Sequence, residues 1–274
     1  MIHFQNDQVT VFQSAIQKTN SMVIETIDTV FVIDPTWLPR EVDEIRQWAN
    51  QRRVGRRLVL IFTHSDFDHV LGYGAFREGK VIASRRLRVH PDKDGVLHQI
   101  KDWDNKNYVQ RSYDVQFPRV DIAIEHNDQT ISVESNTLTF TQTPGHNSDG
   151  MFTLFDDLGI MLAGDYLSDF EKPFLNHGYD EYLQSLEKAR HWINNGRVKL
   201  LIPGHGEVTA DVSEMTRRVD SGVEYLKRLE KAIREKNEEG MRQIGDEMPF
   251  PSEFTKAAHE TNVRLIRAEI EGKL

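Results

Sequence analysis

Two histidines and two aspartates are packed together in the first third of the chain, as His64, Asp66, Asp68 and His69 in the pattern His-x-Asp-x-Asp-His. Imidazole nitrogens and carboxylate oxygens are side-chain atoms that bind divalent metal ions. The run just before them, Leu58–Phe62, is apolar and β-prone, which predicts a buried strand. Burying such polar side chains at the end of a strand costs free energy unless they are paired or bind a metal, so the pattern predicts a metal site there.

Three further segments share one pattern, in which an apolar strand is followed by a tight glycine turn and then by a ligand-type residue. They are Thr143–His146, Ala163–Asp165 and Pro203–Gly206. Glycine lets the backbone turn sharply and brings the next side chain to a common rim. These turns add His146, Asp165 and His205 to the four candidates of the first cluster. Seven ligands exceed the needs of one tetrahedral ion and suit two ions that share a bridging residue.

The order of these motifs resembles the metallo-β-lactamase-fold hydrolase superfamily. Its signature is His-x-His-x-Asp-His, then a distant His, an Asp and a last His, each after a strand. The segments Thr-Pro-Gly-His and Pro-Gly-His-Gly also recur in that superfamily, and the match here runs from about residue 29 to residue 206. The resemblance implies an α/β fold, a four-layer αββα sandwich, with residues 1–274 as a single domain.

The resemblance also implies roles for the seven candidates. The first ion would be held by His64, Asp66 and His146, the second by Asp68, His69 and His205, and Asp165 would bridge them. A hydroxide between the ions would be the nucleophile, because a bound divalent ion lowers the pKa of water to about 7. Asp68 would orient that hydroxide and later pass a proton to the leaving group.

Asp66 departs from the family pattern, which usually has histidine at this position. The extra carboxylate leaves two divalent ions, one hydroxide and their acidic ligands with no net charge. A neutral site is a poorer Lewis acid and its oxygen-rich first position is harder, which favours manganese or iron over zinc. Flavodiiron proteins of the superfamily also carry a carboxylate here and bind iron, but this chain shows no trace of their flavin domain. The alternative is that Asp66 weakens the first site and leaves a single ion.

We therefore expect an enzyme, a hydrolase with two divalent metal ions (zinc, manganese or iron) that splits an ester-type bond in a small molecule. Carboxylic esters, lactones, thioesters and phosphoesters all remain candidates, because a double-metal rim activates water and steadies the developing oxyanion together. The absence of cysteine argues against antibiotic hydrolysis, since true β-lactamases commonly place a cysteine at the second metal. The alternative is an iron-binding redox or sensor module on the same fold. A nuclease is a third hypothesis, which a net charge of −9 opposes.

Three residues outside the ligand set are candidates for supporting roles. Asp34 follows the predicted strand Thr29–Ile33, and an aspartate near this point supports the metal ligands in the family. A metal-bound histidine usually needs such a partner on its other ring nitrogen; a simple turn at Asp34 is the alternative. Tyr166 and His177 follow Asp165 in the sequence and are candidates for the substrate pocket, with pocket wall or plain surface as the alternative.

Composition narrows the class of protein. The chain has 274 residues, of which 38% are hydrophobic and 28% charged, and these values suit a soluble globular protein. The net charge of −9 disfavours a nucleic-acid partner, and the lack of cysteine suits a reducing compartment. Neither a signal peptide nor an apolar run of membrane length is visible. We expect a cytoplasmic protein with a small-molecule substrate, no nucleic-acid partner and no membrane contact.

Apolar periodicity predicts the elements that must position these residues. The predicted strands are Gln8–Gln13, Ser21–Glu25, Thr29–Ile33, Leu58–Phe62, Lys80–Ala83, Val120–Ile124, Thr130–Val133, Leu138–Thr143, Met151–Phe155, Ile160–Ala163 and Val198–Ile202. The predicted helices are Pro39–Gln51, Asp92–Lys106, Tyr179–Asn194, Ser213–Glu238 and Ser252–Glu271, with a break at Gly240–Pro251. Residues 211–274 are then C-terminal helices, whose apolar stripe either packs on the same domain or forms a homodimer contact. The aromatic-rich residues 84–127 are a candidate lid over the substrate, with a local core as the alternative.

Overall fold

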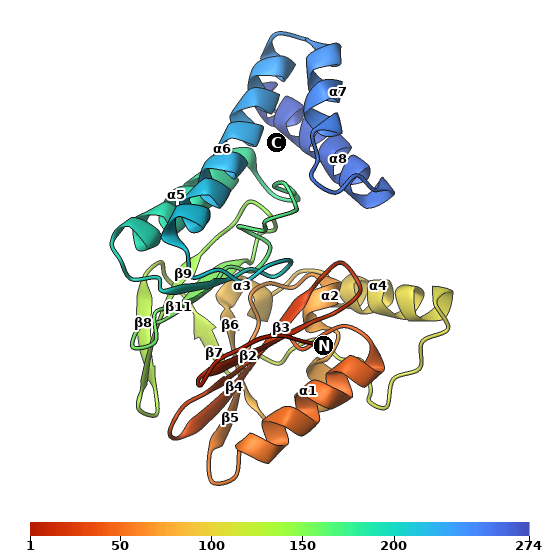
Figure 1. Cartoon of the computed structure of the whole chain (residues 1–274). Coiled ribbons are helices and arrows are strands. Elements are labelled where there is room, and N and C mark those ends of the chain that lie inside the picture. Colours follow the sequence, from red (N-terminus) through yellow and green to blue (C-terminus); the bar gives the residue numbers. More distant parts are fainter. Residues whose placement is uncertain (274) are drawn as a thin grey trace. The chain divides into compact units, whose positions relative to one another are not determined.

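The computed structural model describes residues 1–273, which form a mixed α/β fold with two sheets (Figure 1). The chain divides into two compact units. The first holds Met1–Thr141 and Met151–Asp157, and the second holds Gln142–Gly150 and the chain from Leu158 onward. The short segment that carries the turn at His146 therefore belongs with the later part of the chain.

The first unit is built on a seven-stranded sheet. Its strands, in order across the sheet, are β1 (Ile2–Gln5), β2 (Val9–Gln13), β3 (Asn20–Glu25), β4 (Thr29–Ile33), β5 (Arg57–Ile61), β6 (Lys80–Ser84) and β7 (Ile122–Ile124). The pairs from β1 to β4 are antiparallel and the pairs from β4 to β7 are parallel. Ile33 pairs with Ile61 at the carboxyl ends of β4 and β5, so the residues that follow these two strands emerge at one edge.

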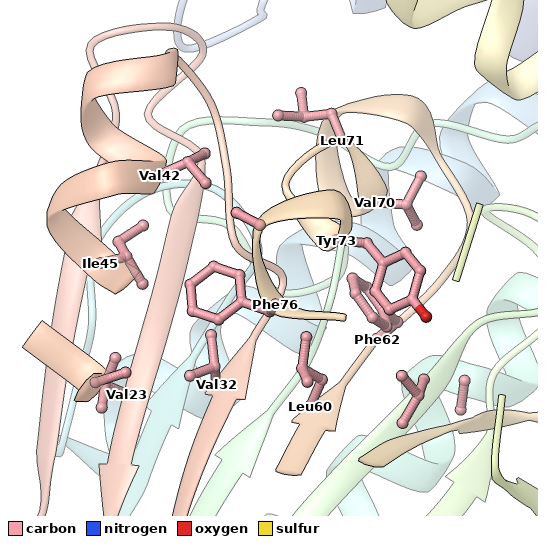
Figure 2. Packing of buried hydrophobic residues seen from close by; sticks show 14 of the residues in the cluster. Val23, Val32, Val42, Ile45, Leu60, Phe62, Val70, Leu71, Tyr73 and Phe76 are labelled. Atoms are coloured by element: carbon pink, nitrogen blue, oxygen red, sulfur yellow. The ribbon is translucent and has the colours of Figure 1, made fainter. Parts of the chain in front are cut away.

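Helices cover one face of this sheet. The helices of this unit are α1 (Pro39–Arg52), α2 (Phe67–Val70), the 3₁₀ helix η1 (Tyr73–Phe76), α3 (Arg85–Arg88) and α4 (Lys93–Lys106). Figure 2 shows the ring of Phe76 facing Val42 and Ile45 of α1, with Val32 and Leu60 of the sheet below it. Burying one such side chain contributes about 1.5 to 3 kcal/mol, so this cluster fixes α1 and η1 on the sheet.

The opposite face of β4 meets the second sheet. That sheet contains β8 (Gln129–Val133), β9 (Asn136–Gln142), β10 (Met151–Phe155), β11 (Ile160–Leu162) and β12 (Leu200–Ile202), in the order β12-β11-β10-β9-β8. Within the first unit, the rings of Phe31 on β4 and Phe155 on β10 make an edge contact with centroids 5.0 Å apart. Strand β4 is therefore buried on both faces, which explains why its sequence is a continuous apolar run.

The second unit carries the later helices. They are α5 (Tyr179–Asn194), α6 (Val212–Arg234), α7 (Glu238–Asp246) and α8 (Glu253–Ile270), and α6 packs against each of the other three. Helix α5 also holds the segment Gln142–Gly150, because Ser185 donates to the Pro144 carbonyl at 2.8 Å and Lys188 donates to the Gln142 carbonyl at 2.6 Å. In the described part of the chain, no helix combines the length and the apolar composition needed to cross a bilayer.

The predicted helix Ser213–Glu238 and the break after it are wrong in detail. Helix α6 ends at Arg234, and α7 occupies part of the range Gly240–Pro251 that was expected to be irregular. Lys236 has a φ of 54°, which ends the first helix. Asn237 then accepts the N–H of Gly240 at 2.8 Å and caps α7, so glycine lies in the first turn of a helix rather than between helices.

Residues 84–127 contain α3, α4 and β7. The ring of Trp103 on α4 stacks near Trp37 with centroids 4.5 Å apart, and Tyr113 and Phe117 also pack against the core. Tyr108, in contrast, is 94% exposed. Most aromatic side chains of this stretch therefore contribute to a local core, and its role as a lid stays a prediction.

Candidate metal centre

One buried carboxylate organises the edge of the first sheet where β4 and β5 end. Asp34 follows β4 with a φ of 43°, a left-handed conformation that aspartate adopts more readily than most residues. Its Oδ1 accepts the backbone N–H of Thr63 at 3.0 Å, and its Oδ2 accepts the Thr63 hydroxyl at 2.5 Å. The same Oδ2 lies 3.0 Å from Nδ1 of His69. Asp34 makes the contact that the sequence predicts for a residue supporting a metal-bound histidine.

These contacts assign the protonated nitrogen in both histidines of the first cluster. A carboxylate oxygen accepts only, so His69 carries its proton on Nδ1. The Thr63 hydroxyl donates to Asp34 and therefore accepts from Nδ1 of His64, 3.0 Å away. In the neutral form of both rings, Nε2 is then the unprotonated nitrogen, and this is the form that binds a metal.

The Nε2 atoms of both rings face a carboxylate. Nε2 of His64 is 3.7 Å from Oδ2 of Asp66, and Nε2 of His69 is 3.5 Å from Oδ2 of Asp68. Asp66 precedes α2 and Asp68 lies in its first turn, where the Thr36 hydroxyl donates to the Asp68 carbonyl. The Asp66 side chain is 32% exposed, whereas the other three are almost fully buried, so Asp66 is the most open of the four.

The second unit presents one carboxylate between two histidines. Nε2 of His146 is 3.3 Å from Oδ2 of Asp165, and Nε2 of His205 is 3.4 Å from Oδ1 of the same residue. The two oxygens of Asp165 thus face different histidines. Nδ1 of His146 donates to the Phe174 carbonyl at 2.7 Å, so Nε2 is the unprotonated nitrogen in the neutral form of the ring, and it faces Asp165.

Two glycines allow the turns of this unit to pack closely against neighbouring residues. Gly145 has a φ of 130°, and a Cβ there would lie 2.4 Å from the Cα of Tyr182 on α5. A Cβ on Gly204 would lie 2.5 Å from Oδ1 of Asp165. Only a residue without a side chain fits at either position, so the glycines in Thr143–His146 and Pro203–Gly206 have a steric reason.

Tyr166 lies behind the turn that carries His146. Its hydroxyl accepts the His146 N–H and donates to the Thr143 carbonyl, both at 3.0 Å. Burial raises the pKa of this phenol, so the proton needed for donation is retained. His177 is exposed, and its backbone N–H donates to a carbonyl of the same turn at 3.1 Å. Contact of either residue with substrate stays a prediction.

The spacing of the donor atoms tests whether these side chains fit an ion. Two donors that each lie about 2.1 Å from a tetrahedral ion are roughly 3.4 Å apart. The four nitrogen–oxygen pairs are separated by 3.3 to 3.7 Å, which is longer than a good hydrogen bond. Imidazole and carboxylate together suit zinc, manganese and iron. Each unit therefore offers donor pairs whose chemistry and spacing fit a divalent ion.

The structure gathers the predicted ligands within each unit. Candidate ligand atoms lie within 4.8 Å of each other in the pairs His64 with Asp66, Asp68 with His69, and His146 with Asp165. Sequence reasoning missed the groups that orient the rings of His64 and His146, which are the Thr63 hydroxyl and the Phe174 carbonyl. Thr63 could have been found, because it directly precedes His64. A main-chain carbonyl cannot be found in this way, because every residue has one.

Comparison with known proteins gives the same family as the motifs. The family model of the metallo-beta-lactamase superfamily matches residues 17–205, which is more than half of the chain. A curated relative named atrochrysone carboxyl ACP thioesterase, from Aspergillus fumigatus, is 30% identical over 111 residues. That match covers 38% of this chain and 31% of the relative, so it spans about a third of the relative's length.

Solved structures resemble the whole fold. A metallo-beta-lactamase family protein from Thermus thermophilus is similar with a TM-score of 0.67 and 17% identity, over 97% of this chain and 95% of that one. A double mutant of the sec-alkyl sulfatase PisA1 is similar with a TM-score of 0.71 and 13% identity, over 99% of this chain and 50% of that one. The predicted α/β fold of the metallo-β-lactamase type is confirmed. The chain belongs to the metallo-beta-lactamase superfamily.

Proposed function

We propose that the protein is a metal-dependent hydrolase that cleaves an ester-type bond in a small molecule. The observation that carries the proposal is the set of four Nε2–carboxylate pairs, separated by 3.3 to 3.7 Å. Membership of a superfamily that includes hydrolases supports it. Bound divalent ions would supply a water acidified to a pKa of about 7 and positive charge beside the developing oxyanion.

The ligands divide over two ions in this proposal. His64, Asp66 and His146 would hold the first ion, Asp68, His69 and His205 would hold the second, and Asp165 would contribute to both. The two oxygens of Asp165 that face different histidines support the bridging role. The partly exposed Asp66 carboxylate adds a hard ligand to the first position, and this favours manganese or iron over zinc.

Asp68 is the residue that moves the proton. Its carboxylate is almost fully buried and sits in the first turn of α2, which the Thr36 hydroxyl and the core residues Val70 and Leu71 hold in place. A carboxylate so fixed accepts the proton of the attacking water at one oxygen and returns it to the leaving-group atom. The same side chain therefore serves as general base and then as general acid.

The bond cleaved is a thioester, a carboxylic ester, a lactone or a phosphoester. The Aspergillus fumigatus relative is named a thioesterase, which supports the thioester before the others. A small-molecule thioester, ester, lactone and phosphodiester, each with a chromogenic or coupled readout, should be offered to metal-loaded protein. Turnover of one class with purified protein is the expected result.

Asp68→Ala should abolish that turnover and leave the fold intact, because in this proposal the carboxylate binds metal and moves protons and is not part of the hydrophobic core. Asp94→Ala, which removes an exposed carboxylate from the first turn of α4, is the matched control and should keep full activity. Full turnover by Asp68→Ala would disprove its role. Tight iron binding without turnover of any substrate class would move the proposal to the iron-binding redox or sensor module.

Elemental mass spectrometry of protein purified without added metal tests the ions directly. About two equivalents are expected for the two-ion site of this superfamily type, with manganese or iron above zinc. Asp66→His should shift the preference toward zinc. An unchanged preference in that variant would mean that Asp66 does not bind metal.

A further inference from the structure

A buried asparagine on the last helix contacts the loop that holds His146. Asn262 of α8 is fully buried. Its Nδ2 donates to the Pro173 carbonyl at 2.7 Å, and its Oδ1 accepts the N–H of Leu175 at 2.8 Å. Between these two contacts lies Phe174, whose carbonyl accepts from Nδ1 of His146.

One peptide group joins the two side chains. The N–H of Leu175 and the carbonyl of Phe174 belong to the same planar amide, and they point in opposite directions in a trans peptide. Asn262 therefore binds one side of this amide and His146 binds the other, at 2.8 and 2.7 Å. Hydrogen bonds in such a chain polarise one another, so the contact with Asn262 strengthens the carbonyl as an acceptor for His146.

The orientation of the Asn262 amide is itself determined by its neighbours. Nε2 of His259 faces the Met241 carbonyl at 2.9 Å, and a carbonyl accepts only, so the proton of His259 lies on Nε2. Nδ1 of His259 then accepts from the Tyr225 hydroxyl at 2.9 Å. That hydroxyl is left to accept from Nδ2 of Asn262 at 3.0 Å, which turns Oδ1 toward Leu175.

Ring packing supports the same loop from α8. The ring of Phe254 makes an edge contact with the ring of Phe174, with centroids 5.8 Å apart, and the Phe174 ring in turn contacts His146 at the same centroid distance. Helix α8 thus holds the Phe174 segment by its backbone and by its side chain. All of these residues belong to the second unit.

We infer that Asn262 is a positioning residue for His146. By holding the Phe174–Leu175 amide, it keeps the Phe174 carbonyl in place as the acceptor for Nδ1 of His146, so that Nε2 stays directed at Asp165. The role as a metal-positioning residue rests on the proposed function, in which His146 binds an ion. Asn262 lies beyond residues 17–205 that match the family model, so the C-terminal helices of this chain add a support that the matched region lacks.

Nitrogen-15 NMR of the metal-free protein tests the inference without any activity, with the His146 signals assigned by comparison with His146→Gln. The wild-type ring should show an Nδ1–H signal that is protected from solvent exchange by its hydrogen bond to the Phe174 carbonyl. Asn262→Leu should lose this protection, because nothing then holds the Phe174–Leu175 amide in place. Asn262→Ala replaces the leucine variant if the latter does not fold.

Zinc affinity, measured by competition with a chromogenic chelator, is the second readout. Loss of an indirect support for a metal ligand should weaken binding about tenfold in Asn262→Leu. Thr255→Ala is the matched control, because Thr255 is a buried polar residue of the same helix whose hydroxyl accepts the N–H of the N-cap residue Ser252 and donates to the Phe250 carbonyl. It should keep the protected Nδ1–H signal and the affinity.

A folded Asn262→Leu protein with the wild-type protection of the His146 Nδ1–H would overturn the inference, whatever its affinity. Failure of the proposed function looks different: the wild-type protein would bind no metal, while the protection of the His146 Nδ1–H would still depend on Asn262. The NMR result therefore decides the positioning role, and the metal titration of the wild-type protein decides the proposed function.

Discussion

The two units orient their histidines by different means. In the first unit, the carboxylate of Asp34 accepts from His69 directly and from His64 through the Thr63 hydroxyl. In the second unit, His146 donates to a main-chain carbonyl, and its own N–H is bound by the phenol of Tyr166. One side chain thus controls two rings in the first case, whereas backbone geometry controls the ring in the second.

The difference follows from the elements beneath each group. The first pair of histidines emerges beside β4, whose carboxyl end pairs with that of β5, so one residue after β4 reaches both rings. The second group, in contrast, lies on glycine turns, and α5 holds the turn of His146 by hydrogen bonds to its backbone. A single substitution should therefore disable the first group, while the second should respond to changes in backbone shape and helix packing.

Asp34→Ala should have the largest effect, because it leaves Thr63 and His69 with buried donors and no acceptor. Removing one partner from a buried charged network costs about 3 to 5 kcal/mol of unfolding free energy. Metal affinity should fall about 10- to 100-fold, as for other supports of metal-bound histidine. Urea denaturation and chelator competition measure the two losses.

Asp28→Ala is the control at the opposite end of the same strand. Asp28 accepts the N–H of Ser135 at 2.9 Å and the amide of Asn136 at 3.0 Å, but it contacts no candidate ligand. It should change stability and leave metal affinity intact. Equal losses of affinity in the two variants would mean that Asp34 acts only through the fold.

Gly145→Ala should have the next largest effect and should act on the second group alone. The new Cβ meets the backbone of Tyr182, and the φ of 130° is unsuited to alanine, at a combined cost of about 2 to 4 kcal/mol. Gly196→Ala is the control, because Gly196 also has a positive φ but has open space around it. A Gly145→Ala protein as stable as Gly196→Ala would show that the approach to Tyr182 is unimportant.

Tyr166→Phe should cost less, about 1 to 3 kcal/mol, because it leaves the N–H of His146 and the Thr143 carbonyl without their partner. Tyr179→Phe removes a hydroxyl that donates to Glu230 in the same unit and is the matched control. Metal affinity should fall in the first variant only. If it falls more than in Asp34→Ala, the contrast between the two units is reversed.

The smallest expected effect is a dependence of stability on pH, which arises from His259 on α8. Burial lowers the pKa of His259 below its usual 6.5, against weaker opposing effects of the Met241 carbonyl, Glu260 and Asp246. The unfolded chain then binds more protons in this range, so stability is fully present above the unfolded pKa and is lost as the pH falls through the folded one. Urea denaturation from about pH 7 to about pH 5 should show this loss, and His259→Gln should reduce it. Identical pH slopes would contradict the assignment.

The sequence predicts most of the fold because the signals are local. Strands β4 and β10 and helix α5 have the predicted bounds, since apolar periodicity and the flanking Asp, Pro and Gly residues define them without tertiary contacts. The short helix α2 and the helix α7 were missed for the opposite reason. Helix α2 is held by core packing of Val70 and Leu71, and α7 begins at a capping side chain that a neighbouring glycine obscures.

The candidate site was predictable in its residue types and not in its supports. The seven candidate ligands stand out because the segments that carry them follow strands, and the place of Asp34 after β4 was also visible. The contacts of Asn262 with the Phe174 segment join positions nearly ninety residues apart, and only the packing of α8 brings them together. The relevant atoms of Phe174 are main-chain atoms, which every residue possesses.

The main-chain contact of His146 does not constrain which amino acid occupies position 174, and it is the ring contacts of Phe174 with His146 and Phe254 that do so. A carbonyl that holds His146 is supplied by any amino acid at that position, so its hydrogen-bonding role places no demand on the side chain. Asp34 has no such freedom, because only its own carboxylate reaches Thr63 and His69. Among close homologues, position 34 should stay constant, while position 174 should vary among side chains that keep the packing against His146 and Phe254. The glycines that shape the turn of His146 should stay constant as well.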